Sequence, residues 1–288
     1  MRILEIHSRV NTIEEVKEVE KYFDAFYVMG IYEPTEYSWE HNKKYGLDGS
    51  LFAIEDYSWE IPEELKKIGK PIIVDFIPNH IGISTANKKF AFVDERIGDY
   101  EWADTYQINY SSRYALDRMR VALMVLVKTF DGLRFDMAHL LLQKNYNSKH
   151  RVYLGYEPLE KLIETTKQIN PNCILIAEAY QDYNDLKNLG FDYVYRVEPR
   201  RNWFLFPDEK DLIIIDNHDE QLLYWYCNQD LEFLKEKLIY LTTFDNTLWY
   251  LPAIMGYTKR PSANYWYNRQ WDINPKIKEI YLEVLEDA

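Results

Sequence analysis

Cysteine is scarce in this sequence, with only Cys173 and Cys227 among 288 residues. Two cysteines are too few for the disulfide framework of a small secreted domain, and Cys173 begins an apolar run where a buried thiol is expected. No run approaches the ~18 consecutive apolar residues that a membrane-spanning helix needs. The first residues also have neither the apolar core nor the cleavage site of a secretory signal. We therefore expect a cytoplasmic protein outside the membrane.

Basic residues are also in deficit. The chain has 34 Lys and Arg against 47 Asp and Glu, which gives a net charge of −13. This charge repels phosphate backbones and anionic lipid surfaces, so neither nucleic acid nor membrane is an expected partner. Hydrophobic residues make up 47% of the chain, enough for a large core, and the 25 Tyr and 8 Trp suit both core packing and stacking against sugar rings.

Strand-like apolar runs alternate with amphipathic stretches, which is the sequence form of repeated βα units. Helical spacing is expected over 12–22, 60–68, 111–129, 156–169, 229–241 and 274–287, with little helical signal between the sixth and seventh strands. The strands are expected near 3–7, 25–30, 71–76, 132–136, 173–178, 192–196, 211–216 and 247–251. The pattern predicts the α/β class and one (β/α)8 TIM barrel domain over 1–288, because no linker or repeat divides the chain.

Two of the connections are long, 31–59 after the second strand and 81–110 after the third. Loops that follow barrel strands form the catalytic face of this architecture, so inserted length marks the expected substrate site. We expect a short inserted subdomain at about 81–110.

Four strand-like runs end in polar residues, at 74–80, 132–136, 174–178 and 213–219. Because the carboxyl ends of barrel strands meet around one axis, their carboxylates are expected to share one pocket. Glycosidic cleavage needs such a set: a carboxylic acid to protonate the leaving oxygen, an ionised carboxylate opposite it, and further negative charge to stabilise the transition state.

Each of these residues alone also fits a structural role. Asp75 fits a strand-end cap with Arg134 as its salt-bridge partner, and His80 and His218 fit satisfied core histidines. No His-x-x-x-His or cysteine-rich spacing supports a transition-metal site. The occurrence of all four segments together, at spacings that fit a barrel, favours a sugar-cleaving site over a separate structural role for each residue.

These four segments resemble the four sequence regions of the α-amylase superfamily, glycoside hydrolase family 13, in the family's order. The first strand, residues 49–57 and residues 101–104 are also similar to the family. The resemblance implies Asp136 as the nucleophile, Glu178 as the acid/base and Asp219 as the transition-state stabiliser. It further implies sugar contacts from substrate-binding residues, namely Phe52, Asp75, His80 and His218, with Phe52 where the family usually has a stacking Tyr.

Strand alternation places Arg134 on the same side as Asp136, where its positive charge would keep the nucleophile ionised. Asn79 matches a calcium-ligand position of α-amylases, so calcium is an open question and no other cofactor is expected. The sequence departs from the family in a reduced insertion after strand 3, in His139 followed by Leu140 instead of a Lys-His pair, and in having no C-terminal β-sandwich. Apolar surface that such extra domains cover in relatives is expected here to be covered by self-association in a homo-oligomer or to be replaced by polar residues.

Three functions remain open at this point. The first is a retaining α-glycosidase that acts on α-glucans or maltooligosaccharides through a covalent glycosyl-enzyme intermediate. An α-glucan transferase would use the same carboxylates, and a non-catalytic barrel would serve carbohydrate binding or assembly. The presence of all three carboxylates favours an enzyme, whereas the sequence leaves open hydrolysis or transfer and the chain length of the substrate.

Overall fold

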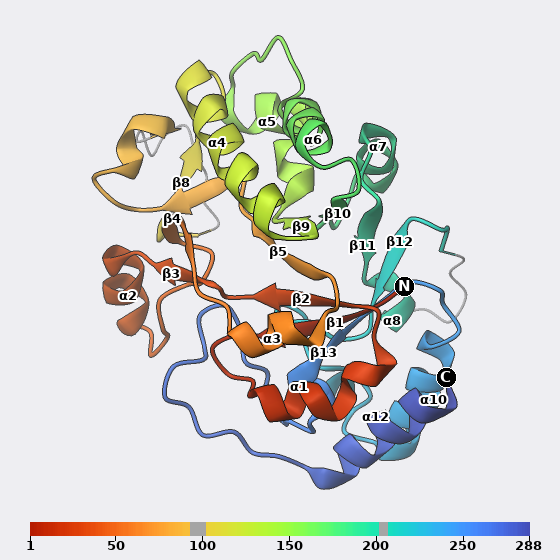
Figure 1. The fold of residues 1–288 in the computed structure, drawn as a ribbon. Coiled ribbons are helices and arrows are strands. Elements are labelled where there is room, and N and C mark those ends of the chain that lie inside the picture. The colour runs from red at the N-terminus through yellow and green to blue at the C-terminus, as the bar shows by residue number, and fades with distance from the viewer. Residues whose placement is uncertain (93–101, 202–206) are drawn as a thin grey trace. The chain divides into compact units, whose positions relative to one another are not determined.

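The computed structural model describes residues 1–92, 102–201 and 207–288. Eight of its strands form a closed parallel barrel in the order β1-β13-β12-β11-β10-β9-β5-β2 (Figure 1). The predicted (β/α)8 barrel is therefore confirmed: seven strands lie within the ranges expected from the sequence, and β1 begins one residue before its range. The strands are β1 (Arg2–His7), β2 (Ala25–Met29), β5 (Ile72–Phe76), β9 (Gly132–Phe135), β10 (Ile174–Ala177), β11 (Tyr193–Arg196), β12 (Asp211–Ile214) and β13 (Thr247–Tyr250).

The barrel strands are short apolar runs whose side chains are buried on both faces. All five residues of β2 and of β5 are buried, as are all four residues of β9 and of β13. A parallel strand covered on both faces has this continuous apolar pattern because it meets side chains inside the barrel and helices outside it. A charged residue within such a strand is therefore a signal of function.

The predicted helices all form, each inside its expected range. They are α1 (Ile13–Val19) with a 3-10 turn at Glu20–Tyr22, α3 (Glu63–Ile68), α4 (Arg113–Thr129), α6 (Pro158–Ile169), α10 (Leu231–Leu241) and α12 (Pro275–Asp287). Their first turns follow local chemistry: Thr12 and Glu15 form a capping box, and Asn274 caps α12 ahead of Pro275. The sequence did not predict α2 (Glu36–Lys43), α5 (Gln143–His150), α7 (Tyr183–Leu189), α8 (Glu198–Arg201), α9 (Leu223–Tyr226) and α11 (Leu251–Ile254).

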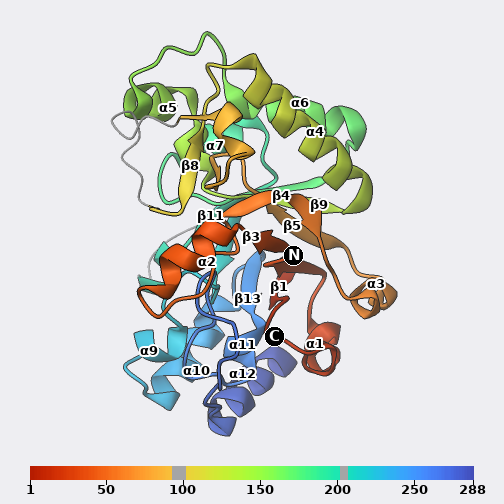
Figure 2. The same ribbon diagram turned by 90° about the vertical axis from the view of Figure 1, so that its left-hand side faces the viewer.

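Two compact units divide the chain. The first unit comprises residues 1–29, 61–72 and 195–288, and the second comprises 30–60 and 73–194. In the first unit α10 packs on α12, and in the second α4 packs on α6, as both ribbon views show (Figures 1 and 2). The expectation of one domain over 1–288 stays a prediction.

The two long connections carry small antiparallel sheets in the second unit. Residues 31–59 hold β3 (Tyr32–Pro34), α2 and β4 (Ile54–Trp59), with β3 paired to β4. The expected subdomain at 81–110 holds part of β6 (His80–Gly82), a 3-10 turn at Asn87–Phe90, β7 (Ala91–Phe92) and β8 (Thr105–Ile108), ordered β6-β8-β7, while its residues 93–101 lie outside the described residues. The connections touch at Gly82, where a Cβ would lie 2.4 Å from the Ala53 carbonyl oxygen.

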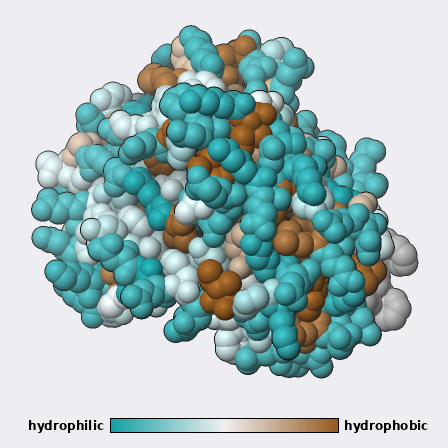
Figure 3. Space-filling model, turned by 60° about the horizontal axis from the view of Figure 1, so that its bottom comes forward, coloured by the Kyte–Doolittle hydropathy of each residue, from teal (hydrophilic) through white to brown (hydrophobic). Residues whose placement is uncertain are grey.

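No helix within the described ranges is long and apolar enough to cross a membrane. Figure 3 shows a face on which hydrophilic side chains dominate and hydrophobic atoms form separate patches. On α4, Val121, Met124 and Val125 are exposed at spacings that place them on one side of the helix. The predicted homo-oligomer stays a prediction.

Gly256 lies in the turn after α11 and has a positive φ, and Gly46, which also has a positive φ, serves as its control. Gly256 has φ +81° and a Cβ there would lie 2.4 Å from the Asn274 carbonyl oxygen, whereas Gly46 has φ +71° with nothing within 4 Å. Gly46→Ala should lower the free energy of unfolding by about 1 kcal/mol, the cost of a left-handed residue. Gly256→Ala should cost clearly more because the backbone must also move. Urea unfolding midpoints measure both, and equal midpoints would contradict the close contact.

Candidate active site

Three neighbouring strands of the second unit place four charged residues at their carboxyl ends. Asp75 is the fourth residue of β5 and pairs in register with Arg134 of β9, which in turn pairs with Ile176 of β10. Asp136 follows β9 directly and Glu178 follows β10. All four side chains belong to residues that are at most 4% exposed. The convergence expected for Asp75, Arg134, Asp136 and Glu178 is thus observed within this unit.

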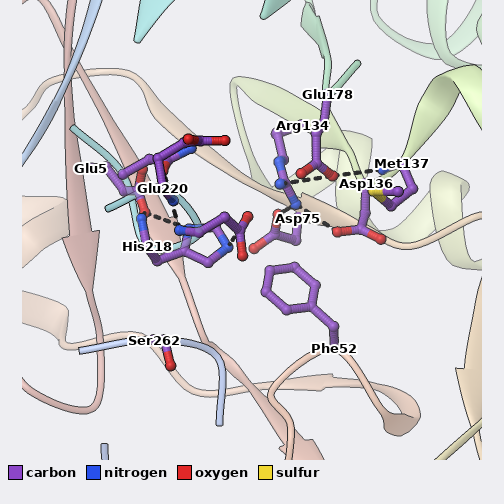
Figure 4. Close-up of polar contacts among 12 residues, drawn as sticks. Glu5, Phe52, Asp75, Arg134, Asp136, Met137, Glu178, His218, Glu220 and Ser262 are labelled. Carbon is purple, nitrogen blue, oxygen red and sulfur yellow. Dashed lines mark hydrogen bonds and ion pairs between the residues drawn. The ribbon is translucent and has the colours of Figure 1, made fainter. Parts of the chain in front are cut away.

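The Arg134 guanidinium binds all three of these carboxylates (Figure 4). Its Nη1 lies 2.9 Å from Asp75 Oδ1 and 2.8 Å from Asp136 Oδ1, and its Nη2 lies 2.9 Å from Glu178 Oε2. From the sequence, Arg134 was expected to pair with Asp136, or with Asp75 in a structural role; its ion pair with Glu178 was not predicted. Only a planar, permanently charged fork offers donors in several directions at this depth, so lysine is not an equivalent here.

The backbone after Asp136 adopts an unusual conformation. Met137 has φ 47° and ψ 40°, in the left-handed region that costs a non-glycine residue about 1 kcal/mol. This conformation directs the Met137 N–H to Glu178 Oε2 at 2.7 Å. Next to it, Ala138 N donates to the Glu178 carbonyl oxygen at 3.0 Å. The strained residue therefore helps to fix the orientation of the Glu178 carboxylate, which is where stored strain is expected in a functional site.

Tyr180 also contacts Glu178, from the strand-to-helix connection that follows β10. Its hydroxyl donates to Glu178 Oε1 at 3.3 Å, and the residue is 37% exposed. The two oxygens of Glu178 therefore differ: Oε2 forms the ion pair with Arg134 and accepts the hydrogen bond of the Met137 N–H, whereas Oε1 faces a residue at the surface. Tyr180 was not predicted from the sequence, because an aromatic residue after a strand is common.

Phe52 and His80 border the same cluster. The Arg134 guanidinium carbon lies 5.3 Å from the Phe52 ring centroid, a cation–π distance. Burial first, then the positive charges of Lys149 and Arg134, lower the pKa of His80 to about 3, so its imidazole is neutral at physiological pH. Its Nε2 is 3.8 Å from Asp136 Oδ2, too long for a hydrogen bond and without the charge for an ion pair.

Asn79 is engaged with a neighbouring amide. Its Oδ1 accepts from Gln107 Nε2 at 2.8 Å, and the same nitrogen donates to the Asn79 carbonyl oxygen. Calcium binds oxygen acceptors, so an N–H donor facing this oxygen does not fit such an ion. Throughout the described part of the chain, no three His, Cys, Asp or Glu residues are grouped to hold a metal. The calcium prediction stays open, and no chemistry is derived from it.

In the first unit, His218 and Asp219 follow β12, and His218 contacts both Asp219 and Glu5 of β1. His218 Nδ1 lies 2.6 Å from Glu5 Oε1 (Figure 4). Its Nε2 lies 3.0 Å from Asp219 Oδ2. Burial opposes the charged imidazole, but the Asp219 and Glu5 carboxylates together raise the pKa of His218 to about 10. Glu5 was not predicted from the sequence, although a carboxylate within the apolar run of β1 is a recognisable signal.

The eight predicted catalytic and substrate-binding residues thus fall into two groups, one in each unit, and their catalytic and sugar-binding roles stay predictions. The second unit holds Phe52, Asp75, His80, Arg134, Asp136 and Glu178, and the first unit holds His218 and Asp219.

Removal of the Arg134 charge should destabilise the protein strongly. Arg134→Met leaves three buried carboxylates without their shared cation, which should cost about 3–5 kcal/mol at neutral pH. Acidification should narrow this difference because protonated carboxyls no longer repel one another. Urea unfolding at both pH values measures it, with Arg113→Met as the control, since that exposed pair with Asp117 should contribute less than about 1 kcal/mol. A loss that is equal at both pH values would argue against this origin.

The two buried histidines should differ in charge when observed by NMR. From about pH 5 to about pH 8, the His80 ring should keep the chemical shifts of a neutral imidazole and the His218 ring those of an imidazolium. The pKa of His218, raised to about 10, lies above the unperturbed 6.5. Its contribution to stability is therefore complete below pH 6.5 and is lost as the pH rises through about 10. Titration of either ring near neutrality would contradict the contacts described.

Solved structures of α-amylase-type enzymes share this fold. The α-amylase from Lactobacillus plantarum superposes with a TM-score of 0.71 at 15% identity, over 99% of this chain and 79% of that one. The Geobacillus thermoleovorans α-amylase complexed with acarbose gives 0.69 at 14% identity, over 99% and 77% of the two chains. The cyclic α-maltosyl-(1→6)-maltose hydrolase from Arthrobacter globiformis, in complex with maltose, gives 0.70 at 12% identity, over 95% and 72%.

No protein-family model and no curated protein matches the sequence. At these identities the structural likeness concerns the fold. The resemblance read from the four sequence segments is confirmed at that level: the chain has the barrel fold of the α-amylase-type glycoside hydrolases.

Proposed function

We propose that the protein is a retaining α-glycosidase of the α-amylase type, acting on α-glucans or maltooligosaccharides. The observation that carries the proposal is the buried guanidinium of Arg134, which binds Asp136 and Glu178 through two nitrogens of one planar group. Carboxylates bridged in this way lie near each other, as required in retaining glycosidases, where the two carboxyl groups are about 5–5.5 Å apart. The likeness to enzymes solved with acarbose and maltose supports an α-glucoside as substrate.

In the first step, a carboxylate oxygen of Asp136 attacks the anomeric carbon and the glycosidic carbon–oxygen bond breaks. The Arg134 charge at 2.8 Å favours the ionised nucleophile. The neutral imidazole of His80 suits hydrogen bonding to a sugar hydroxyl, because it adds no positive charge that would oppose an oxocarbenium-like transition state.

Glu178 gives a proton to the departing oxygen in the first step and takes one from the incoming hydroxyl in the second. We assign this exchange to Oε1, because Oε2 is bound by Arg134 and by the Met137 N–H. Asp219 is proposed to stabilise the positive charge of the transition state, with His218 fixing its orientation at 3.0 Å.

Hydrolysis and transfer share this covalent intermediate and differ in the hydroxyl that resolves it. Water gives hydrolysis, whereas a second sugar gives transfer. Incubation of the protein with one maltooligosaccharide of defined length separates the two outcomes. Shorter products alone indicate hydrolysis, and products longer than the substrate indicate transfer.

Substitution of each proposed catalytic carboxylate should have a distinct effect on an activated aryl α-glucoside. Asp136→Asn should reduce turnover on the order of 10⁴-fold or more, because the amide keeps the shape but cannot attack. Glu178→Gln should retain the first step, whose leaving group needs no proton, and stall at the second. Stopped-flow release of the aryl group measures both steps.

Asp182→Asn is the matched control, since this residue pairs with Lys144 and its left-handed backbone accepts asparagine. It should keep wild-type turnover. Retention of turnover by Asp136→Asn would overturn the assignment of the nucleophile. Proton NMR of the first wild-type products should show the anomeric configuration of the substrate, and inverted products would exclude a covalent intermediate.

A further inference from the structure

Asp219 lines a pocket of about 500 Å³ that lies wholly within the first unit. Its walls come from the segment after β12 and from the segment between α11 and α12, and include Trp225, Lys259, Arg260 and Tyr265. The volume falls in the range of small-molecule sites, about 300–1,000 Å³. The pocket combines one carboxylate with two cations and two aromatic rings, a mixture that core packing does not require.

The two cations stand out in a chain with a net charge of −13. Some other basic residues of this unit form ion pairs, such as Lys235 with Glu283 at 2.6 Å and Lys278 with Glu18 at 2.7 Å. Among the described contacts, neither Lys259 nor Arg260 has an ion-pair or hydrogen-bond partner. Asp219 does not neutralise them, since its carboxylate is bound by the charged His218 ring at 3.0 Å.

The segment that carries these cations is held in place before any ligand binds. Asn274 N donates to the Gly256 carbonyl oxygen at 2.8 Å, and Thr258 N donates to the Asp272 carbonyl oxygen at 2.9 Å, which closes the segment at its base. Trp225 Nε1 donates to the Thr258 carbonyl oxygen and so fixes the indole against the segment. Preorganisation of this kind reduces the entropic cost of binding.

The aromatic residues give the pocket faces suited to a sugar ring. Trp225 is 39% exposed although its Nε1 is bound, so part of the ring faces solvent. The Arg269 guanidinium carbon lies 4.2 Å from the Tyr265 ring centroid, which adds a third cation beside the pocket wall. Flat aromatic faces cover the apolar face of a pyranose, while arginine and lysine bind phosphate and carboxylate groups.

We propose that this pocket binds a sugar unit bearing an anionic group, a phosphate or a carboxylate, so that the substrate or acceptor is an anionic glucoside. Lys259 and Arg260 bind the anion and Trp225 and Tyr265 contact the sugar. This inference deepens the proposed function and rests on it, because it assigns a substrate class to the site that contains Asp219.

Calorimetric titration of the full chain with maltose, maltose 6′-phosphate and maltobionate tests the proposal. The phosphate and the carboxylate lie on different sugar units, so the two probes distinguish the two anions. At low salt, at least one should bind about tenfold or more tightly than maltose, as expected for charge-assisted hydrogen bonds. In Lys259→Gln/Arg260→Gln this ratio should fall to near one. Lys276→Gln, which removes an exposed charge outside the pocket, should keep it.

Equal affinity of wild type for all three sugars would overturn the proposal, and so would a ratio that survives the double substitution. Inorganic phosphate that binds as tightly as the sugar phosphate would exclude the sugar contact. The same titrations in Asp136→Asn need no turnover and separate the two proposals. A preference for the anion without turnover of any glucoside by wild type would overturn the proposed function alone, whereas turnover of a neutral aryl glucoside without that preference would overturn the anionic site alone.

Discussion

One buried positive charge organises the second unit. Arg134 extends from the middle strand of three and meets Asp75, Asp136 and Glu178, each contributed by a strand end or by the residue after it. Three buried carboxylates without a cation would repel one another and separate. Electrostatics therefore fixes the spacing between the proposed nucleophile and the proposed acid/base, and the barrel supplies the rigid frame that this spacing needs.

In the first unit the buried cation is a histidine, His218, whose charge depends on its surroundings, unlike the permanent charge of an arginine. His218 is charged because Glu5 and Asp219 bind its two ring nitrogens, at 2.6 and 3.0 Å. In the second unit His80 lies near Arg134 and Lys149, and it is neutral. Burial disfavours the charged form of both histidines: for His80 the nearby positive charges add to this effect, whereas for His218 two carboxylates outweigh it.

Features that follow from hydrophobic periodicity and from the residue types at strand ends could be predicted from the sequence. All eight barrel strands could be predicted because their apolar runs have strand length, and the candidate carboxylates because four of these runs end in polar residues that include Asp or Glu. The left-handed Met137 was not, since no glycine marks it and its conformation arises from tertiary contacts with Glu178. Helices such as α5 were missed because the polar run at 143–150 has a weak apolar stripe and depends on packing.

Gly82 has a consequence for how this barrel can be altered. Its close approach to the Ala53 carbonyl oxygen locks the connection after β2 to the connection after β5, and Asp104 adds a second link through Ser38 Oγ at 2.5 Å. The two connections therefore form one module, although about 20 residues of barrel sequence separate them. Transplanting a loop from another barrel would succeed only if both segments were exchanged together, so changes of length in this region are coupled through a position that can hold only glycine.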